Sequence, residues 1–105
     1  MSKLQIAFSV EDALKYGLNE AIVLAYLDFW VDKNAVRGIN ELEGRYYTYI
    51  SYTRLHERLP FISKRSLQRT IASLVKQKAI ILNFRSGAGV QGGRQMMMTT
   101  IRGTP

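Results

Sequence analysis

The chain has 105 residues, of which 47% are hydrophobic, an ordinary share for one globular domain with a single core. It contains no cysteine and one histidine, which excludes disulfides and thiolate metal sites and argues against a zinc site within one chain. The first residues lack the apolar stretch of a secretory signal, and the longest apolar run, residues 21–27, is far shorter than the ~18 residues that span a bilayer. We therefore expect a soluble, cytoplasmic protein of one domain, residues 1–105, with no cofactor, metal site or membrane partner.

The net charge of +7 is unevenly distributed along the chain. Residues 1–44 carry four basic and seven acidic side chains, a balance of −3. Residues 45–105 carry eleven basic side chains and a single acidic one, Glu57, a balance of +10. A basic segment of this kind suits a polyanion, most often a nucleic acid, although a solubilising surface is the alternative explanation.

The N-terminal third predicts a strand and two helices. Apolar and polar residues alternate over residues 3–10, which is typical of a half-buried strand. Ser9 is placed to cap a short helix that Gly17 ends, and Asp12 completes a pattern like a capping box. Asn19 is then expected to cap a helix that runs to about residue 33 or 34.

This second helix is apolar on nearly every side, whereas a helix on one core needs an apolar stripe over only part of its circumference. More than one neighbour must therefore cover it. Either the N-terminal strand and short helix do so within the monomer, or the helix forms a dimer interface through Tyr26, Phe29 and Trp30.

The remainder of the chain predicts further elements in a simple order. We expect a loop over residues 35–44, a strand over 45–50, a helix over 52–59 capped by Ser51, and a helix from Lys64 to about Gln77 capped by Ser63. Pro60 prevents the two helices from joining, and Phe61 and Ile62 are expected to pack inward between them. A strand over residues 79–84, a glycine-rich loop over 85–94 and a strand over 95–101 then form a hairpin.

This order is the plan of a winged helix: an α+β fold with a helix-turn-helix over about residues 51–77, a small antiparallel sheet with a C-terminal hairpin wing over 79–101, and an N-terminal strand and helix as an extension. The helix after Ser63 places Leu67, Ile71, Leu74 and Val75 on one stripe and basic and amide side chains on the opposite one. An α-helix enters the DNA major groove, where arginine and glutamine pair with base edges. The expected base contacts are Lys64, Arg65, Gln68 and Arg69, and the expected phosphate contacts are Ser63, Ser66, Arg54, Arg58, Arg85 and Arg94.

Residues 52–71, with the sequence YTRLHERLPFISKRSLQRTI, followed by Leu74, Lys78, Ala79 and Ile80, resemble the helix-turn-helix of phage and plasmid replication-initiation proteins, including DnaD-like replisome organisers. Residues 8–14 and 17–21 are similar to the N-terminal segment of that family, so the resemblance covers residues 4–101. It implies origin or operator binding, a recognition role for the four base-contacting residues, and oligomerisation through the N-terminal elements. Family members often have glycine at the position of Ala79 and continue into a C-terminal domain that binds helicase or DNA.

The leading hypothesis is sequence-specific binding of double-stranded DNA by a homodimer of phage or plasmid origin, in replication initiation or transcriptional regulation. Such a protein would associate with the nucleoid when bound, with replication or host proteins as further partners. The alternative is a winged helix that serves as a protein-interaction or oligomerisation module without a DNA site of its own. Tyr46, Tyr47, Tyr49 and Tyr52 raise single-strand binding as a third possibility. No nucleophile or oxyanion site accompanies Glu41 and Glu43, so we do not expect an enzyme.

Overall fold

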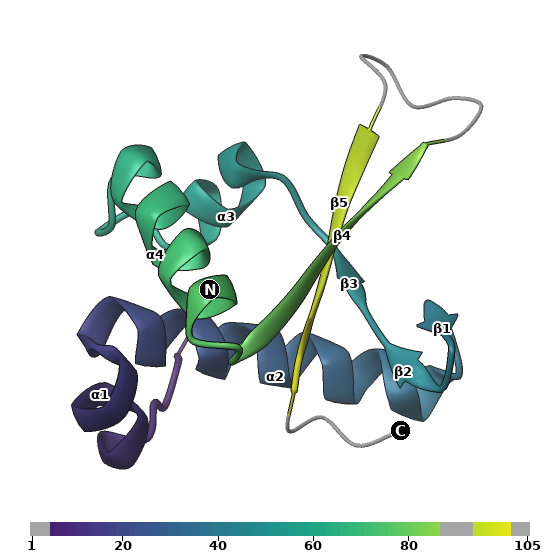
Figure 1. The fold of residues 1–105 in the computed structure, drawn as a ribbon, viewed down its shortest axis with the longest axis horizontal. Coiled ribbons are helices and arrows are strands. Elements are labelled where there is room, and N and C mark those ends of the chain that lie inside the picture. The colour runs from purple at the N-terminus through teal and green to yellow at the C-terminus, as the bar shows by residue number, and fades with distance from the viewer. Residues whose placement is uncertain (1–4, 87–93, 102–105) are drawn as a thin grey trace.

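A three-stranded antiparallel sheet with the strand order β3-β5-β4 lies beside four helices in the computed structural model, which describes residues 5–86 and 94–101 (Figure 1). The described architecture is α+β, as predicted. Its elements in chain order are α1 (Val10–Tyr16), α2 (Leu18–Arg37), β1 (Glu41–Leu42), β2 (Arg45–Tyr46), β3 (Thr48–Tyr49), α3 (Tyr52–Arg58), α4 (Lys64–Lys76), β4 (Ile80–Ser86) and β5 (Arg94–Thr100). None of the helices in these ranges is long and apolar enough to cross a membrane.

The predicted N-terminal strand is wrong over the described part of its range. Residues 5–9 pair with no described strand, and Val10 already begins α1. Ile6 packs against the core, but Phe8 and Val10 are exposed. The alternating apolar residues of this segment therefore do not form the buried face of a strand. The Ser9 cap is confirmed, because the Ser9 hydroxyl accepts a 3.2 Å hydrogen bond from the backbone N–H of Asp12.

Helix α2 is longer at both ends than the sequence predicts. Gly17, with a φ of +121°, ends α1 and also occupies the N-cap position of α2, so the predicted cap at Asn19 is wrong. A left-handed residue is common just after a helix, and Gly38, with a φ of +69°, ends α2 in this way after Arg37.

The predicted loop over residues 35–44 contains a small hairpin. Strands β1 and β2 pair antiparallel around Glu43 and Gly44, whose φ values of +52° and +83° match the two-residue turns that join tight hairpins. The strand predicted over residues 45–50 is broken at Tyr47. The Tyr47 carbonyl accepts a 2.8 Å hydrogen bond from the Asn34 amide of α2, and the Tyr47 N–H donates to the Asn40 carbonyl in the loop after α2. The helix and the loop therefore take the place of a strand partner here.

The C-terminal hairpin is confirmed and extends further than predicted. β4 pairs with β5 from Ile80↔Thr100 to Ser86↔Arg94, and β3 adds to the other edge of β5. Arg85 and Arg94, which were expected in the loop, therefore lie in strands. The rest of the predicted glycine-rich loop, residues 87–93, lies outside the described residues.

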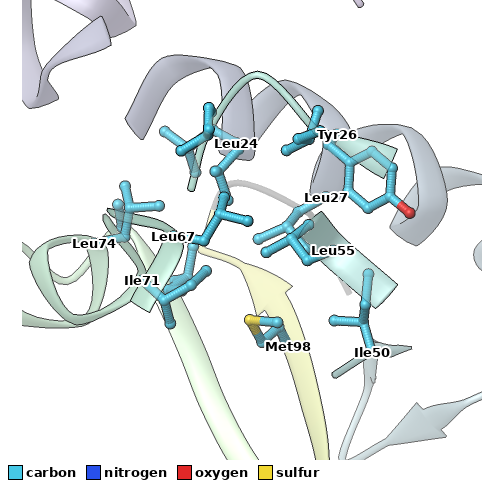
Figure 2. Packing of buried hydrophobic residues seen from close by; sticks show 14 residues of the cluster. Leu24, Tyr26, Leu27, Ile50, Leu55, Leu67, Ile71, Leu74 and Met98 are labelled. Atoms are coloured by element: carbon cyan, nitrogen blue, oxygen red, sulfur yellow. The ribbon is translucent and has the colours of Figure 1, made fainter. Parts of the chain in front are cut away.

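The hydrophobic core forms where α2, α3, α4 and the sheet meet. Figure 2 shows Leu24 and Leu27 of α2 converging with Leu55 of α3, Leu67 of α4 and Met98 of β5, all of which are almost completely buried. α2 also contacts α1, β2 and β3, so much of its apolar circumference is covered within the monomer. Three large apolar side chains of α2 remain exposed: Leu18 at its first position is 57% exposed, and Phe29 and Val36 further along are 52% and 89% exposed.

Candidate nucleic-acid interface

The turn between α3 and α4 is held by one apolar side chain rather than two. Ile62 is buried in the core, whereas Phe61 is 68% exposed, so the inward packing predicted for Phe61 is wrong. The Ile62 N–H donates to the Leu59 carbonyl, and the His56 ring nitrogen Nδ1 lies 2.7 Å from the Ile62 carbonyl oxygen. These bonds fix the turn and therefore the position of α4 relative to α3.

Helix α4 separates an apolar from a polar side, as predicted. Leu67, Ile71 and Leu74 are buried, but the fourth predicted core residue, Val75, is 39% exposed. Thr70 takes its place in the core, where its hydroxyl donates a 2.7 Å hydrogen bond to the Ser66 carbonyl. The opposite side is exposed throughout and carries no acidic residue; it consists of Arg65, Gln68, Arg69, Ala72 and Lys76.

The first turn of α4 leaves Ser66, but not Ser63, with a hydroxyl proton to offer. The Ser63 hydroxyl accepts from the Ser66 N–H at 3.1 Å and donates to the Ser66 hydroxyl oxygen at 3.0 Å. Because a serine hydroxyl has a single proton, the bond to the Ser66 hydroxyl occupies the donor of Ser63. The half-buried Ser66 hydroxyl accepts that bond and keeps its own proton.

Lys64 is exposed like the other predicted base contacts, but its side chain has a partner within the chain. Its ammonium donates a 2.9 Å hydrogen bond to the Thr53 hydroxyl in the first turn of α3, so its side chain folds back toward the neighbouring helix. Arg65, Gln68 and Arg69 point outward from α4 without such a contact within the described chain. All four predicted base contacts are therefore exposed, and Lys64 also contacts the neighbouring helix.

Arg54 and Arg58, predicted as phosphate contacts, are exposed on the part of α3 that adjoins α2. Both line a cavity between α3, β3 and α2, together with Tyr26 and Trp30. This cavity is the site feature that sequence reasoning missed. The four-residue spacing of the arginines on α3 was visible, but the element that they face was not.

The remaining predicted phosphate contacts, Arg85 and Arg94, lie at the far end of the hairpin, where the Ser86↔Arg94 pair is the last of the ladder. In Figure 1 this end of the hairpin rises on the same side of α2 as α3 and α4. Helix α4, which packs against α2, and the Ser86↔Arg94 end of the hairpin therefore lie on the same side of α2.

The predicted oligomer contacts divide between core and surface. Tyr26 is only 5% exposed and belongs to the core cluster, so it has too little surface to form a direct contact with another chain. Phe29 is exposed and packs edge-on against the half-buried Trp30 at a ring distance of 5.4 Å. The Lys33 ammonium lies 5.3 and 5.5 Å from the centres of these two rings.

The tyrosines proposed for base stacking are engaged in the fold. Tyr47 is buried, and its hydroxyl accepts a hydrogen bond from the Asn83 amide. Tyr46, Tyr49 and Tyr52 are half-buried. Within the described residues, no group of three histidine or acidic side chains is arranged to hold a metal ion.

Comparisons with known proteins leave the family undecided. Models of protein families, curated proteins and solved structures gave no match to this chain.

Proposed function

We propose that this chain is a winged-helix domain that binds double-stranded DNA sequence-specifically, with α4 as the recognition helix and the β4–β5 hairpin as the wing. The observation that carries the proposal is the exposed side of α4, which combines two arginines, a glutamine and a lysine with no acidic residue. The side of α4 opposite to it is anchored in the core, so the helix presents these groups on a rigid support.

Base reading is assigned to Arg65, Gln68 and Arg69, in the first two turns of α4. Arginine pairs bidentately with guanine, and glutamine pairs with adenine, in the major groove. Lys64 reaches DNA only by giving up its bond to Thr53, so we assign it to a phosphate rather than a base. Ser66, Arg85 and Arg94 supply further phosphate contacts, since hydroxyl and guanidinium groups are the usual donors to the DNA backbone.

The resemblance of residues 52–71 to replication-initiation proteins supports a role in replication initiation or transcriptional regulation, with the chain acting as a homodimer. Such a role rests on the sequence pattern alone. The chemistry of α4 favours DNA over other polyanions, because it offers planar, bidentate donors rather than lysines only.

The direct test is to replace Arg65 by alanine and to measure affinity for the preferred duplex and for a random duplex. We expect a loss of about 1–3 kcal/mol on the preferred duplex and relaxed preference at one base position. Arg37→Ala, the same change at an exposed position in the last turn of α2, should leave both affinities unchanged. An equal loss on both duplexes would contradict base reading by Arg65.

A second candidate function is a protein-interaction or oligomerisation module. It is favoured by the exposed apolar surface of α2, where Phe29 and Val36 border an open pocket of about 330 Å³ together with Lys33. Large exposed apolar side chains that lie together often mark a protein contact. This surface and the exposed side of α4 involve different residues, so the two functions are compatible.

A further inference from the structure

A cavity of about 190 Å³ lies between the C-terminal half of α2, strand β3 and helix α3. Its walls include Tyr26, Trp30 and Asn34 from α2, Thr48 from β3, and Arg54 and Arg58 from α3. It is much larger than the space that one water molecule needs, yet smaller than the ~300–1,000 Å³ of pockets for drug-sized ligands. Its size therefore suits a small molecule.

Two positive charges face this cavity. Arg54 and Arg58 are four residues apart on α3, so their side chains lie on the same side of the helix. Within residues 5–86 and 94–101, neither guanidinium forms an ion pair with a carboxylate. Both arginines lie close enough to the Tyr26 hydroxyl to oppose the rise in its pKa that burial causes. The cavity is therefore positively charged.

A neutral hydrogen-bond donor completes the wall opposite the arginines. The Tyr26 side chain is almost buried, and in Figure 2 its hydroxyl points away from Leu24 and Leu27. The Trp30 ring lies 6.4 Å from the Tyr26 ring. A neutral phenol carries one proton that it can donate to a bound group. By contrast, the Asn34 amide nitrogen is committed to the Tyr47 carbonyl.

We propose that this cavity binds a small oxyanion, the phosphate or carboxylate group of a small molecule. Two guanidinium groups and a phenol proton converge there, and guanidinium binds both kinds of oxyanion through paired, charge-assisted hydrogen bonds. The site is separate from the exposed side of α4 and does not depend on DNA binding. It also reassigns Arg54 and Arg58, because an arginine that holds an anion in a cavity is not free to grip the backbone of a duplex.

The fluorescence of Trp30 provides a direct readout, since it is the only tryptophan of the chain and lines the cavity. The full chain is titrated to millimolar concentrations with inorganic phosphate and, separately, with malonate, against sodium chloride at matched ionic strength. We expect a saturable change with at least one oxyanion and none with chloride. Saturation by phosphate alone would identify a phosphate ligand, and saturation by malonate alone a carboxylate. The same response to chloride, or no saturable response to either oxyanion, would overturn the proposal.

Substitutions of single arginines show whether the oxyanion binds in this cavity. Arg54→Gln and Arg58→Gln should each weaken oxyanion binding by about tenfold, because each removes charge-assisted hydrogen bonds. Arg58→Lys keeps the positive charge but loses the paired donors of the guanidinium group. This variant should also bind the oxyanion less tightly than the unmodified chain. Arg65→Gln, the same chemical change on α4, should bind the oxyanion as the unmodified chain does. Unchanged binding in both Arg54→Gln and Arg58→Gln would contradict the site even if Trp30 responds to oxyanions.

Discussion

The imidazole Nδ1 of His56 donates a hydrogen bond of 2.7 Å to the carbonyl oxygen of Ile62, across the turn that joins α3 to α4. A carbonyl oxygen can only accept, so Nδ1 carries the proton in this bond. Ile62 is itself buried between the two helices. Ile62 therefore orients α4 in two ways, through the hydrogen bond from His56 and through the burial of its own side chain. α4 is the helix to which we assign DNA recognition.

Replacing His56 by alanine should lower the free energy of unfolding by about 1–2 kcal/mol, because it removes this bond and leaves a half-buried carbonyl without its partner. His56→Asn should retain part of the lost stability, since its amide can donate from a similar position. Urea denaturation gives the free energy of unfolding of both variants. Glu57→Ala, at the exposed neighbouring position, is the control and should change stability by no more than about 0.5 kcal/mol. Equal stability of His56→Ala and the unmodified chain would show that the turn does not depend on His56.

Two adjacent threonines of β5 should respond to the same substitution in opposite directions. The Thr100 hydroxyl donates a 2.6 Å hydrogen bond to the Asp28 carboxylate of α2, whereas the buried Thr99 hydroxyl has no partner in the described part of the chain. Thr100→Val should cost about 1.5–3 kcal/mol, the usual contribution of a bond to a charged group. Thr99→Val should stabilise the fold by about 1 kcal/mol, since it removes an unsatisfied buried hydroxyl. Thermal and urea unfolding of the two variants compare them directly, and destabilisation of both by the same amount would contradict this assignment.

The helices of the basic half could be predicted closely from local chemistry. Ser51 and Ser63 cap α3 and α4 as expected, because a cap depends on residues within one turn. The alternation over residues 3–10 led to a wrong prediction of a strand. A strand also needs a neighbouring strand to pair with, and local sequence does not show whether there is one. The burial of Thr70 was not predicted, and its hydroxyl avoids the cost of an unpaired buried polar group by donating to the Ser66 carbonyl.

Burial raises the pKa of Tyr26 above its ordinary value of 10, an effect that Arg58, the Trp30 hydrogen bond and Arg54 partly offset. A pKa that is higher in the folded than in the unfolded chain means that the folded state holds the phenol proton more tightly. The stability from this group is therefore fully present below pH 10 and is lost as the pH rises through the folded pKa.

Unfolding free energies measured on both sides of pH 10 should fall more steeply for the unmodified chain than for Tyr26→Phe. Some decline should persist in the variant, because burial also raises the pKa of Tyr52. The slopes are compared rather than the absolute values, since the variant also removes a hydroxyl group from the fold. Parallel slopes would show that Tyr26 does not contribute to the alkaline loss of stability.

Phe29→Glu should convert a dimer into a monomer if α2 forms the homodimer contact that we propose. A charge at this position would have to be buried in the interface without a partner, which is strongly unfavourable. Sedimentation velocity separates the two masses. Phe61→Glu, the same change at an exposed residue of the α3–α4 turn, should leave the dimer intact. A folded Phe29→Glu protein with the mass of the unmodified chain would exclude this surface as the interface.

The candidate site could be predicted only where one helix determines it. The exposure of Arg65, Gln68 and Arg69 follows from the helical period of α4, and the structure places them as expected. The positions of Arg54 and Arg58 depend on α2, which lies well before them in the sequence. The fold-back of Lys64 depends on Thr53, a surface contact that no periodicity reports.

Binding of the chain to double-stranded DNA is measured by a fluorescence-anisotropy titration at two salt concentrations. The chain is titrated against duplexes from the neighbourhood of its own gene and against a random duplex. Neutralisation of about 4–6 phosphates predicts a log–log salt slope of about −4 to −5, with one fragment bound well above random. An absence of binding to every duplex at low salt would contradict the account and would leave the exposed side of α4 to a different partner.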